Sequence, residues 1–284
     1  MNRSLVLIAF AAGCGASVGP AATSARVRVA HVSPGAPAVD FCLAPHGTAS
    51  FTGPILAGAG RAAGLSYGTV TRYFDVEAAR YDVRLVAPGA TDCKQPLANL
   101  DDFTRLPELA DGASATIAAE GTLSGQGDAA FAAIGDLEPL GHAVNDPPLR
   151  LAVFADDTAI TADMVKLRFI HASPGTPAVD VGLGTGATFQ RVFANVAFGK
   201  VAAHPPLENG YVQTAPFIQA VTARLAGSAS DALTVPHVTF EPATISTAFA
   251  IGGKTGDPHN PLRVLLCGDN RPADGLLTSC TIAP

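Results

Sequence analysis

A histidine, a serine and an aspartate lie close together near the start of the chain, and the same three recur 140 residues later. They belong to HVSPGAPAVD (31–40) and HASPGTPAVD (171–180), and they are His31, Ser33, Asp40, His171, Ser173 and Asp180. These residue types could form a hydrolytic relay, in which the histidine takes the serine proton and the aspartate orients the histidine. Ser33, however, directly precedes Pro34, with no G-x-S-x-G setting and no evident oxyanion-hole motif. We therefore predict a structural turn, in which the histidine hydrogen-bonds across the turn and the aspartate accepts from backbone amides.

The two segments are copies of one motif, since eight of their ten positions are identical. Each follows an alternating run, RVRV (26–29) or KLRF (166–169), which is typical of a strand with one buried face. The apolar residues of each run share a parity with the histidine that follows, so each histidine ends a row of core-facing side chains. Pro34 and Pro174 then force the preceding serine into an extended conformation before the chain turns. A repeat at this spacing predicts two tandem domains.

The motif also carries a family resemblance. The pattern R-V-x-H-x-S-P-x-x-P-x-V-D resembles the opening of a bacterial secreted family of domains of unknown function, the DUF4397 type. The segments LSYGTVTRY (65–73) and RYDV (80–83) are similar to that family's later patterns Y-G-x-V-x-x-Y and Y-x-V. The resemblance covers both halves of the chain and implies a β-sandwich domain that is common in exported proteins. The family has no established catalytic residues to carry over.

Composition limits the classes of function. The chain has 284 residues, which suits two domains of about 130 residues each. Its 48% apolar content can fill two cores, and its net charge of −6 argues against a nucleic-acid partner. The charged residues are scattered, so we expect them on solvated faces. No C-x-x-C, HExxH, GxGxxG or Walker pattern occurs, so we predict neither a metal site nor a cofactor.

The N-terminus has the pattern of an export signal. A short basic region and an apolar run precede Cys14, and we expect residues 1–13 to be a signal peptide. The preceding Ala-Ala-Gly resembles the bacterial lipobox, at which cleavage leaves a lipid-modified cysteine, although Ala11 stands where leucine is usual. We therefore predict lipidation of Cys14, followed by a flexible tether through residue 24. The alternative is a secreted protein that is cut near Ala22.

The remaining chain divides into two predicted domains, 25–157 and 164–284, joined by the linker 158–163; the second domain includes a C-terminal tail. Their short strands, separated by Gly, Pro and Asp clusters, predict two immunoglobulin-like β-sandwiches and an all-β fold. The expected strands are 26–32, 38–43, 67–75, 80–87, 114–120, 129–134 and 149–155 in the first domain. Those of the second are 165–171, 178–183, 192–201, 211–225, 233–240, 245–252 and 262–267, the fourth being either continuous or broken at Pro216. Because the linker is short, the two domains are expected to pack together.

The segment 90–112 has no strand pattern, and we expect an irregular loop with one helical turn near 101–109. Its acidic residues could suggest a calcium site, and they are Asp101, Asp102, Glu108 and Asp111. No Asp-x-Asp-x-Asp-Gly loop accompanies them, so we interpret them as solvated.

The cysteines support export. If Cys14 carries lipid, four remain, which is an even number suited to an oxidising compartment. Cys42 aligns with Gly182 of the other repeat, and no cysteine stands near position 223 to match Cys93. A pair confined to the first domain would leave this pattern, so we predict disulfides Cys42–Cys93 and, by remainder, Cys267–Cys280.

Two classes of function remain. The first is a binding or structural module of the cell envelope, held at the periplasmic or outer cell surface by a lipid anchor, whose ligand is an envelope protein or a glycan. The alternative is an exported, hydrolase-like enzyme of unknown substrate. Duplication of the His/Ser/Asp motif favours the first class, because a structural turn must recur in every domain. We therefore expect no catalytic residue.

Overall fold

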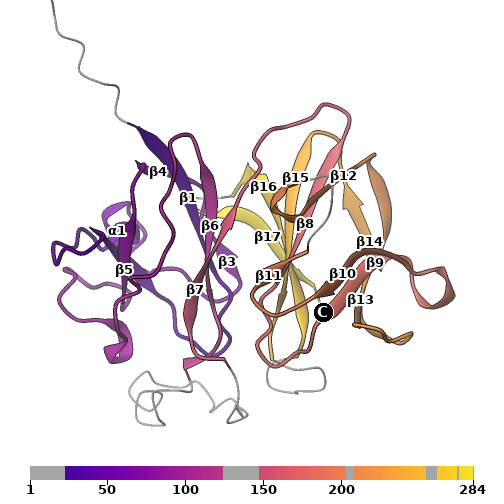
Figure 1. The fold of residues 1–284 in the computed structure, drawn as a ribbon, viewed down its shortest axis with the longest axis horizontal. Coiled ribbons are helices and arrows are strands. Elements are labelled where there is room, and N and C mark those ends of the chain that lie inside the picture. Colours follow the sequence, from indigo (N-terminus) through magenta and orange to yellow (C-terminus); the bar gives the residue numbers. More distant parts are fainter. Residues whose placement is uncertain (1–22, 124–146, 203–207, 254–260, 274, 284) are drawn as a thin grey trace, which may run out of the picture.

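The computed structural model describes residues 23–123, 147–202, 208–253, 261–273 and 275–283. Nearly all of its regular structure is β-strand, as predicted. Figure 1 shows the two halves of the chain side by side, the first in indigo to magenta and the second in rose through orange to yellow. The expected strand at 129–134 lies outside the described residues.

The first half is built from a five-stranded and a two-stranded sheet. In the larger sheet the order is β3–β1–β6–β7, and β4 also pairs with β1. Its strands are β1 (Ser24–His31), β3 (Thr69–Val70), β4 (Phe74–Glu77), β6 (Ser114–Glu120) and β7 (Arg150–Ala155). The smaller sheet pairs β2 (Asp40–Pro45) with β5 (Tyr81–Val86). The helical segments of the first half are α1 (Ile55–Gly58) and the 3-10 turn η1 (Leu97–Asn99). Residues 101–109 form no helix, so the prediction of a helical turn there is wrong.

The second half contains a six-stranded and a four-stranded sheet, which form a sandwich. The larger sheet has the order β11–β8–β15–β16–β17, with β12 also on β8, and the smaller one β10–β9–β13–β14. The strands of the larger sheet are β8 (Val165–His171), β11 (Lys200–Val201), β12 (Tyr211–Thr214), β15 (Thr244–Ile251), β16 (Arg263–Pro272) and β17 (Thr278–Ala283). Those of the smaller are β9 (Val179–Leu183), β10 (Gln190–Val196), β13 (Phe217–Leu225) and β14 (Asp231–Phe240). The 3-10 turn η3 (Gly186–Thr188) lies between β9 and β10, and η4 (Glu208–Gly210) lies between β11 and β12.

The central strands pair in the same way in both halves. β1 runs parallel to β6, with Val29 opposite Ile117, and β8 runs parallel to β15, with Phe169 opposite Ala248. A parallel pair needs a long connection, which here passes through the second sheet. Local sequence patterns do not reveal such a pairing, because its partners are far apart along the chain.

Each central strand buries both of its faces, which corrects the expected single buried face. Val27 and Val29 belong to the core of the first half, and Phe169 to that of the second. The alternate residues form a third apolar cluster between the halves, which includes Ala30 and Ile170. Since side chains alternate along a strand, one face of β1 and β8 fills each sandwich and the other face joins the two sandwiches.

β17 strengthens this junction and was absent from the predicted strands. It pairs with β16 in its own half and also lies against β3 of the first half. There the amide of Arg72 donates to the carbonyl of Leu276 at 2.7 Å, and the hydroxyl of Thr278 donates to the carbonyl of Thr71 at 2.8 Å. β17 therefore ties the second half of the chain to β3 of the first half.

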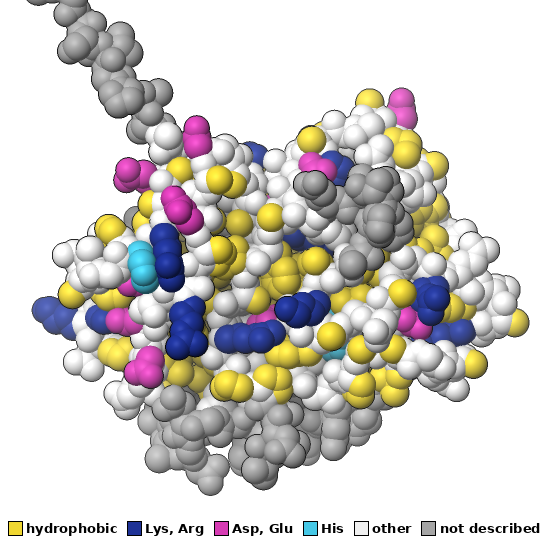
Figure 2. All heavy atoms as spheres, viewed as in Figure 1, with side chains coloured by type: hydrophobic (Ala, Val, Ile, Leu, Met, Phe, Trp, Pro, Cys, Tyr) yellow, Lys and Arg dark blue, Asp and Glu magenta, His cyan; other side chains and the backbone are white. Residues whose placement is uncertain are grey.

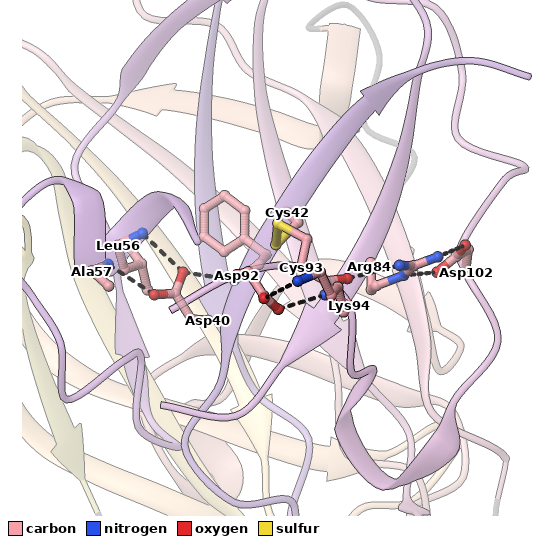
Figure 3. Close-up of a disulfide and its surroundings, with 10 residues drawn as sticks. Asp40, Cys42, Leu56, Ala57, Arg84, Asp92, Cys93, Lys94 and Asp102 are labelled. Carbon is pink, nitrogen blue, oxygen red and sulfur yellow. Dashed lines mark hydrogen bonds and ion pairs between the residues drawn. A yellow bond between two sulfur atoms is a disulfide. The ribbon is translucent and has the colours of Figure 1, made fainter. Parts of the chain in front are cut away.

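Two disulfides join the pairs expected from the sequence. Cys42 on β2 is bonded to Cys93, and Cys267 on β16 to Cys280 on β17. Figure 3 shows the first of these in its surroundings, where Arg84 on the neighbouring strand pairs with Asp102 at 2.7 Å. Cys42–Cys93 thus holds the irregular loop of the first half against its smaller sheet.

The immunoglobulin-like subtype and the domain limits at 157 and 164 stay predictions.

Candidate functional site

The two motif histidines occupy equivalent buried positions. The Nε2 atom of His31 donates to the carbonyl of Pro37 at 2.8 Å, and that of His171 to the carbonyl of Pro177 at 2.9 Å. Each ring packs edge-on against an aromatic residue, Tyr67 or Phe198. Neither histidine has exposed surface, and burial lowers the pKa of both imidazoles, because it disfavours the charged form. Both are therefore neutral groups that close the turn, as the sequence predicts.

The motif serines fasten the same turn to the strand beside it. Ser33 Oγ donates to the carbonyl of Gly121, which follows β6, at 2.6 Å. Ser173 Oγ donates to the carbonyl of Gly253, which follows β15. The prolines after these serines, Pro34 and Pro174, each begin a two-residue turn. Each hydroxyl thus has a backbone carbonyl of its own half as a hydrogen-bond acceptor.

The motif aspartates bind backbone amides elsewhere in each sandwich. Asp40 accepts from the amides of Leu56 and Ala57, both at 2.8 Å, at the beginning of α1 (Figure 3). Asp180 accepts from the amide of Asn195 at 2.7 Å. Burial by itself would raise the pKa of Asp180. The hydrogen bond from the Asn195 amide and the nearby Arg191 guanidinium outweigh burial and hold this pKa below its usual value. Among the described residues, no hydrogen bond or ion pair joins a motif aspartate to its histidine, so the three side chains do not form a relay.

A cluster of buried charges joins the two halves, and sequence reasoning missed it. Arg28 Nη1 on β1 lies 2.7 Å from Asp269 Oδ1 on β16, and Arg168 Nη2 on β8 lies 2.6 Å from Asp156 Oδ1, just after β7. Each arginine thus pairs with the aspartate of the other half. All four side chains are at most 2% exposed. We call these four residues the crossed pairs; their placement corrects the expectation that charges lie on solvated faces.

Threonine and tyrosine side chains complete this cluster. Thr116 Oγ1 donates to Asp156 at 2.8 Å, and Thr247 Oγ1 donates to Asp269 at 2.6 Å. Tyr73 OH donates to Asp156 at 2.7 Å, and the ring of Tyr211 lies beneath the Arg168 guanidinium, 4.6 Å away. The partners in the two halves therefore match type for type. Buried charges are tolerated only when they are paired and hydrogen-bonded in this way.

Electrostatics agree with this geometry. Burial alone would raise the pKa of Asp156, but Arg168 and Arg28 outweigh burial and lower it. The pKa of each arginine is raised, because the attraction of the two aspartates exceeds the cost of burial. Asp156 and the two arginines are therefore charged near neutral pH.

The sequence held one signal of the cluster. Arg28 and Arg168 stand at the same place in the two repeats, on the face of the strand opposite to the core-facing row. The alternation of side chains shows that this face points away from the core of its own half. It does not show whether water or another sheet covers the face. Figure 2 shows positively and negatively charged side chains on the outer surface in that view. From the sequence, every charged residue is expected to lie on such a solvated face.

The acidic loop of the first half binds other parts of the chain. Asp102 pairs with Arg84, and Asp111 Oδ1 accepts from the amide of Ser24 at 3.0 Å. Within the described ranges, no group of three or more His, Cys, Asp or Glu residues is placed to hold a metal ion. In those ranges no helix is long and apolar enough to cross a membrane. Cys14 lies outside them.

Comparison with known proteins identifies a family. The model of the DUF4397 family, a domain of unknown function, matches residues 25–182. A comparison with curated proteins finds no match. Among solved structures, the chain is matched to a candidate cell adhesion protein from Bacteroides eggerthii, with 10% identity, 92% of this chain and 95% of that chain covered, and a TM-score of 0.16. At that score the likeness carries no argument.

Proposed function

Since the chain belongs to the DUF4397 family of domains of unknown function, we propose its role from its own residues: an exported binding or structural module of the cell envelope. In this proposal Cys14 carries the lipid that holds the protein at the periplasmic or outer cell surface. The Ala-Ala-Gly-Cys sequence after a basic and apolar leader supports this anchor.

One observation carries the module proposal. In both copies of the motif, the histidine and the serine are buried and bonded to backbone carbonyls of the fold itself. A serine nucleophile needs a histidine base within hydrogen-bond reach and access for a substrate. Here the same internal bonds recur in both copies, which is the pattern of a structural turn that every domain requires.

The contacts between the two halves also support a presenting role. The crossed pairs, the apolar cluster between the halves and β17 fix one half against the other. Surfaces on the two halves then keep a constant relative position. A ligand that contacts both surfaces therefore does not lose binding free energy by ordering the two halves. An envelope protein or a glycan is the proposed class of ligand.

The anchor is tested by fractionation of wild-type cells and of cells that produce Cys14→Ser. We expect the wild type in the membrane fraction, with an intact mass that begins at a lipid-modified Cys14, and the variant in the soluble fraction. Membrane association that survives Cys14→Ser, or a mature mass that begins near Ala22, would overturn the anchor.

The module role is tested by a broad hydrolase-substrate screen of the purified protein beside the Ser33→Ala and Ser173→Ala variants. We expect no turnover by any of the three. Robust turnover that either variant abolishes without a change in melting temperature would replace the module proposal with the enzyme alternative.

A further inference from the structure

The sandwich of the second half contains a cavity between its two sheets. Its volume is about 170 Å³, whereas the cavity at the equivalent place in the first half has only about 40 Å³. The surface of the larger cavity is mostly apolar, with Leu167, Phe169, Val181, Val221, Phe240 and Ala248 on its walls. Well-packed interiors seldom leave voids of this size.

The two cavities occupy the same place in the repeat. Equivalent residues line both of them: Val27 and Leu167, Val29 and Phe169, Phe41 and Val181, Val83 and Val221, Ile117 and Ala248. Strand pairing supports this equivalence, since Ile117 lies opposite Val29 and Ala248 lies opposite Phe169. The difference in volume therefore comes from how the space is filled and not from a different fold.

The first half fills the space with a loop that the second half lacks. Leu106, Pro107 and Leu109 from the segment between η1 and β6 line its cavity, and the amide of Leu109 donates to the carbonyl of Ala79 at 3.0 Å. In the second half the corresponding stretch forms β14 at the edge of the smaller sheet. From this strand only Phe240 lines the cavity. No plug equivalent to Leu106–Leu109 lines the second cavity within the described residues.

The polar side chains of the lining define the chemistry of an occupant. They are Arg168, Thr214 and Ser246. The Arg168 guanidinium is committed to Asp156 at 2.6 Å and to the carbonyl of Ala155 at 3.0 Å, so it offers no free charge. A charged ligand would lose its hydration here without a partner. An apolar cavity of about 150 Å³ in another protein stays dry and binds benzene, so this one is large enough for such a molecule.

We propose that the cavity in the second half binds one small, uncharged apolar group, of about the size of a benzene ring. This inference rests on the proposed binding role and gives it a ligand class for one site. The first half, with its plugged cavity, takes no such ligand.

The test measures benzene binding to the purified full chain, by saturation-transfer NMR and by the shift of the thermal unfolding midpoint with benzene concentration. We expect both signals in the wild type, because a ligand that binds only the folded state raises the midpoint. Ala248→Ile places the residue of position 117 into the cavity, and we expect it to weaken benzene binding at least about tenfold. Ala220→Ile makes the same change at a half-buried position of β13 that does not line the cavity, and it should bind benzene like the wild type.

If Ala248→Ile fails to fold, Val181→Phe takes its place, since Phe41 is its counterpart in the first half. No benzene signal in the wild type, or equal binding by the cavity variant and by Ala220→Ile, would overturn the inference. Benzene binding is read out independently of membrane fractionation and of substrate turnover, so its failure can be told from theirs. A cavity that binds no benzene leaves the envelope role standing, and a failed anchor leaves the cavity result standing.

Discussion

Arg28 and Asp269 are 241 positions apart in the sequence, yet their side chains meet at 2.7 Å in a place that water does not reach. The reciprocal contact of Arg168 with Asp156 crosses the same boundary in the other direction. Each half therefore supplies the partner that the other half needs for its buried arginine. Separating the halves would leave two arginines and two aspartates without those partners, so the halves are expected to fold and unfold together.

The histidine of the motif is expected to matter more for stability than the serine. His31→Ala removes a buried ring and its bond to Pro37, which should lower the free energy of unfolding by about 1–3 kcal/mol. Ser33→Ala removes one hydrogen bond, to Gly121, and should cost about 0.5–1.5 kcal/mol. Urea unfolding of both variants measures the difference. A larger loss for Ser33→Ala than for His31→Ala would contradict the structural role assigned to the histidine.

Stability is expected to fall on mild acidification. The pKa of His31 and of His171 is lowered by burial, so below about pH 6.5 the unfolded chain binds protons that the folded chain does not. As the pH is lowered in this range, the free energy of unfolding should decrease by up to about 1.4 kcal/mol per pH unit for each of the two histidines. The pKa of Asp156 is also lowered, so its contribution is present above about pH 4 and is lost only in stronger acid.

The pH profile is checked by urea unfolding of the wild type and of His31→Gln between about pH 7 and about pH 5. The variant should show a shallower slope, whatever its stability at neutral pH, because one of the two titrating groups is gone. Identical slopes would show that His31 binds protons equally in the folded and unfolded states.

Reduction of the two disulfides is expected to destabilise the protein. The bonds close loops of 51 and 13 residues by sequence separation, and constraint of the unfolded chain should contribute about 4 and about 3 kcal/mol, respectively. Unfolding of Cys93→Ala and of Cys280→Ala separates the two contributions. Peptide mapping without reductant is the control: a cross-link between Cys42 and Cys280 would refute the connectivity.

Local sequence patterns predicted most strands, because alternation and turn residues act over a few positions. The run KLRF and His171 gave β8 with its observed bounds. β17 escaped because Thr278–Ala283 is short and has a mixed pattern, and its strand character depends on pairing with β16. The loop 97–112 could not be anticipated as a plug, since its apolar residues have no period.

The roles of the motif residues followed from local chemistry, whereas the crossed pairs did not. A histidine six residues before a proline carbonyl can reach it across one turn. Arg28 and Asp269, in contrast, meet only after both sandwiches have formed and packed. Nothing within a few residues of Arg28 distinguishes a buried arginine from a solvated one, except that Arg168 repeats it.

The crossed pairs hold the two halves together as one body. The most direct test of this role is a double-mutant cycle on Arg28 and Asp269, by urea unfolding of Arg28→Met, Asp269→Leu and the double variant. The exposed pair Arg271 and Glu241 provides the control cycle, because its side chains are 50% and 56% exposed and its coupling should be below about 1 kcal/mol.

For the buried pair, each single variant should lose about 3–5 kcal/mol, because it leaves the other charge without this partner. The double variant should lose less than the sum of the two by at least about 2 kcal/mol, and wild-type unfolding should be a single transition. Additive losses, or two separate transitions in the wild type, would show that the crossed pairs do not hold the halves together.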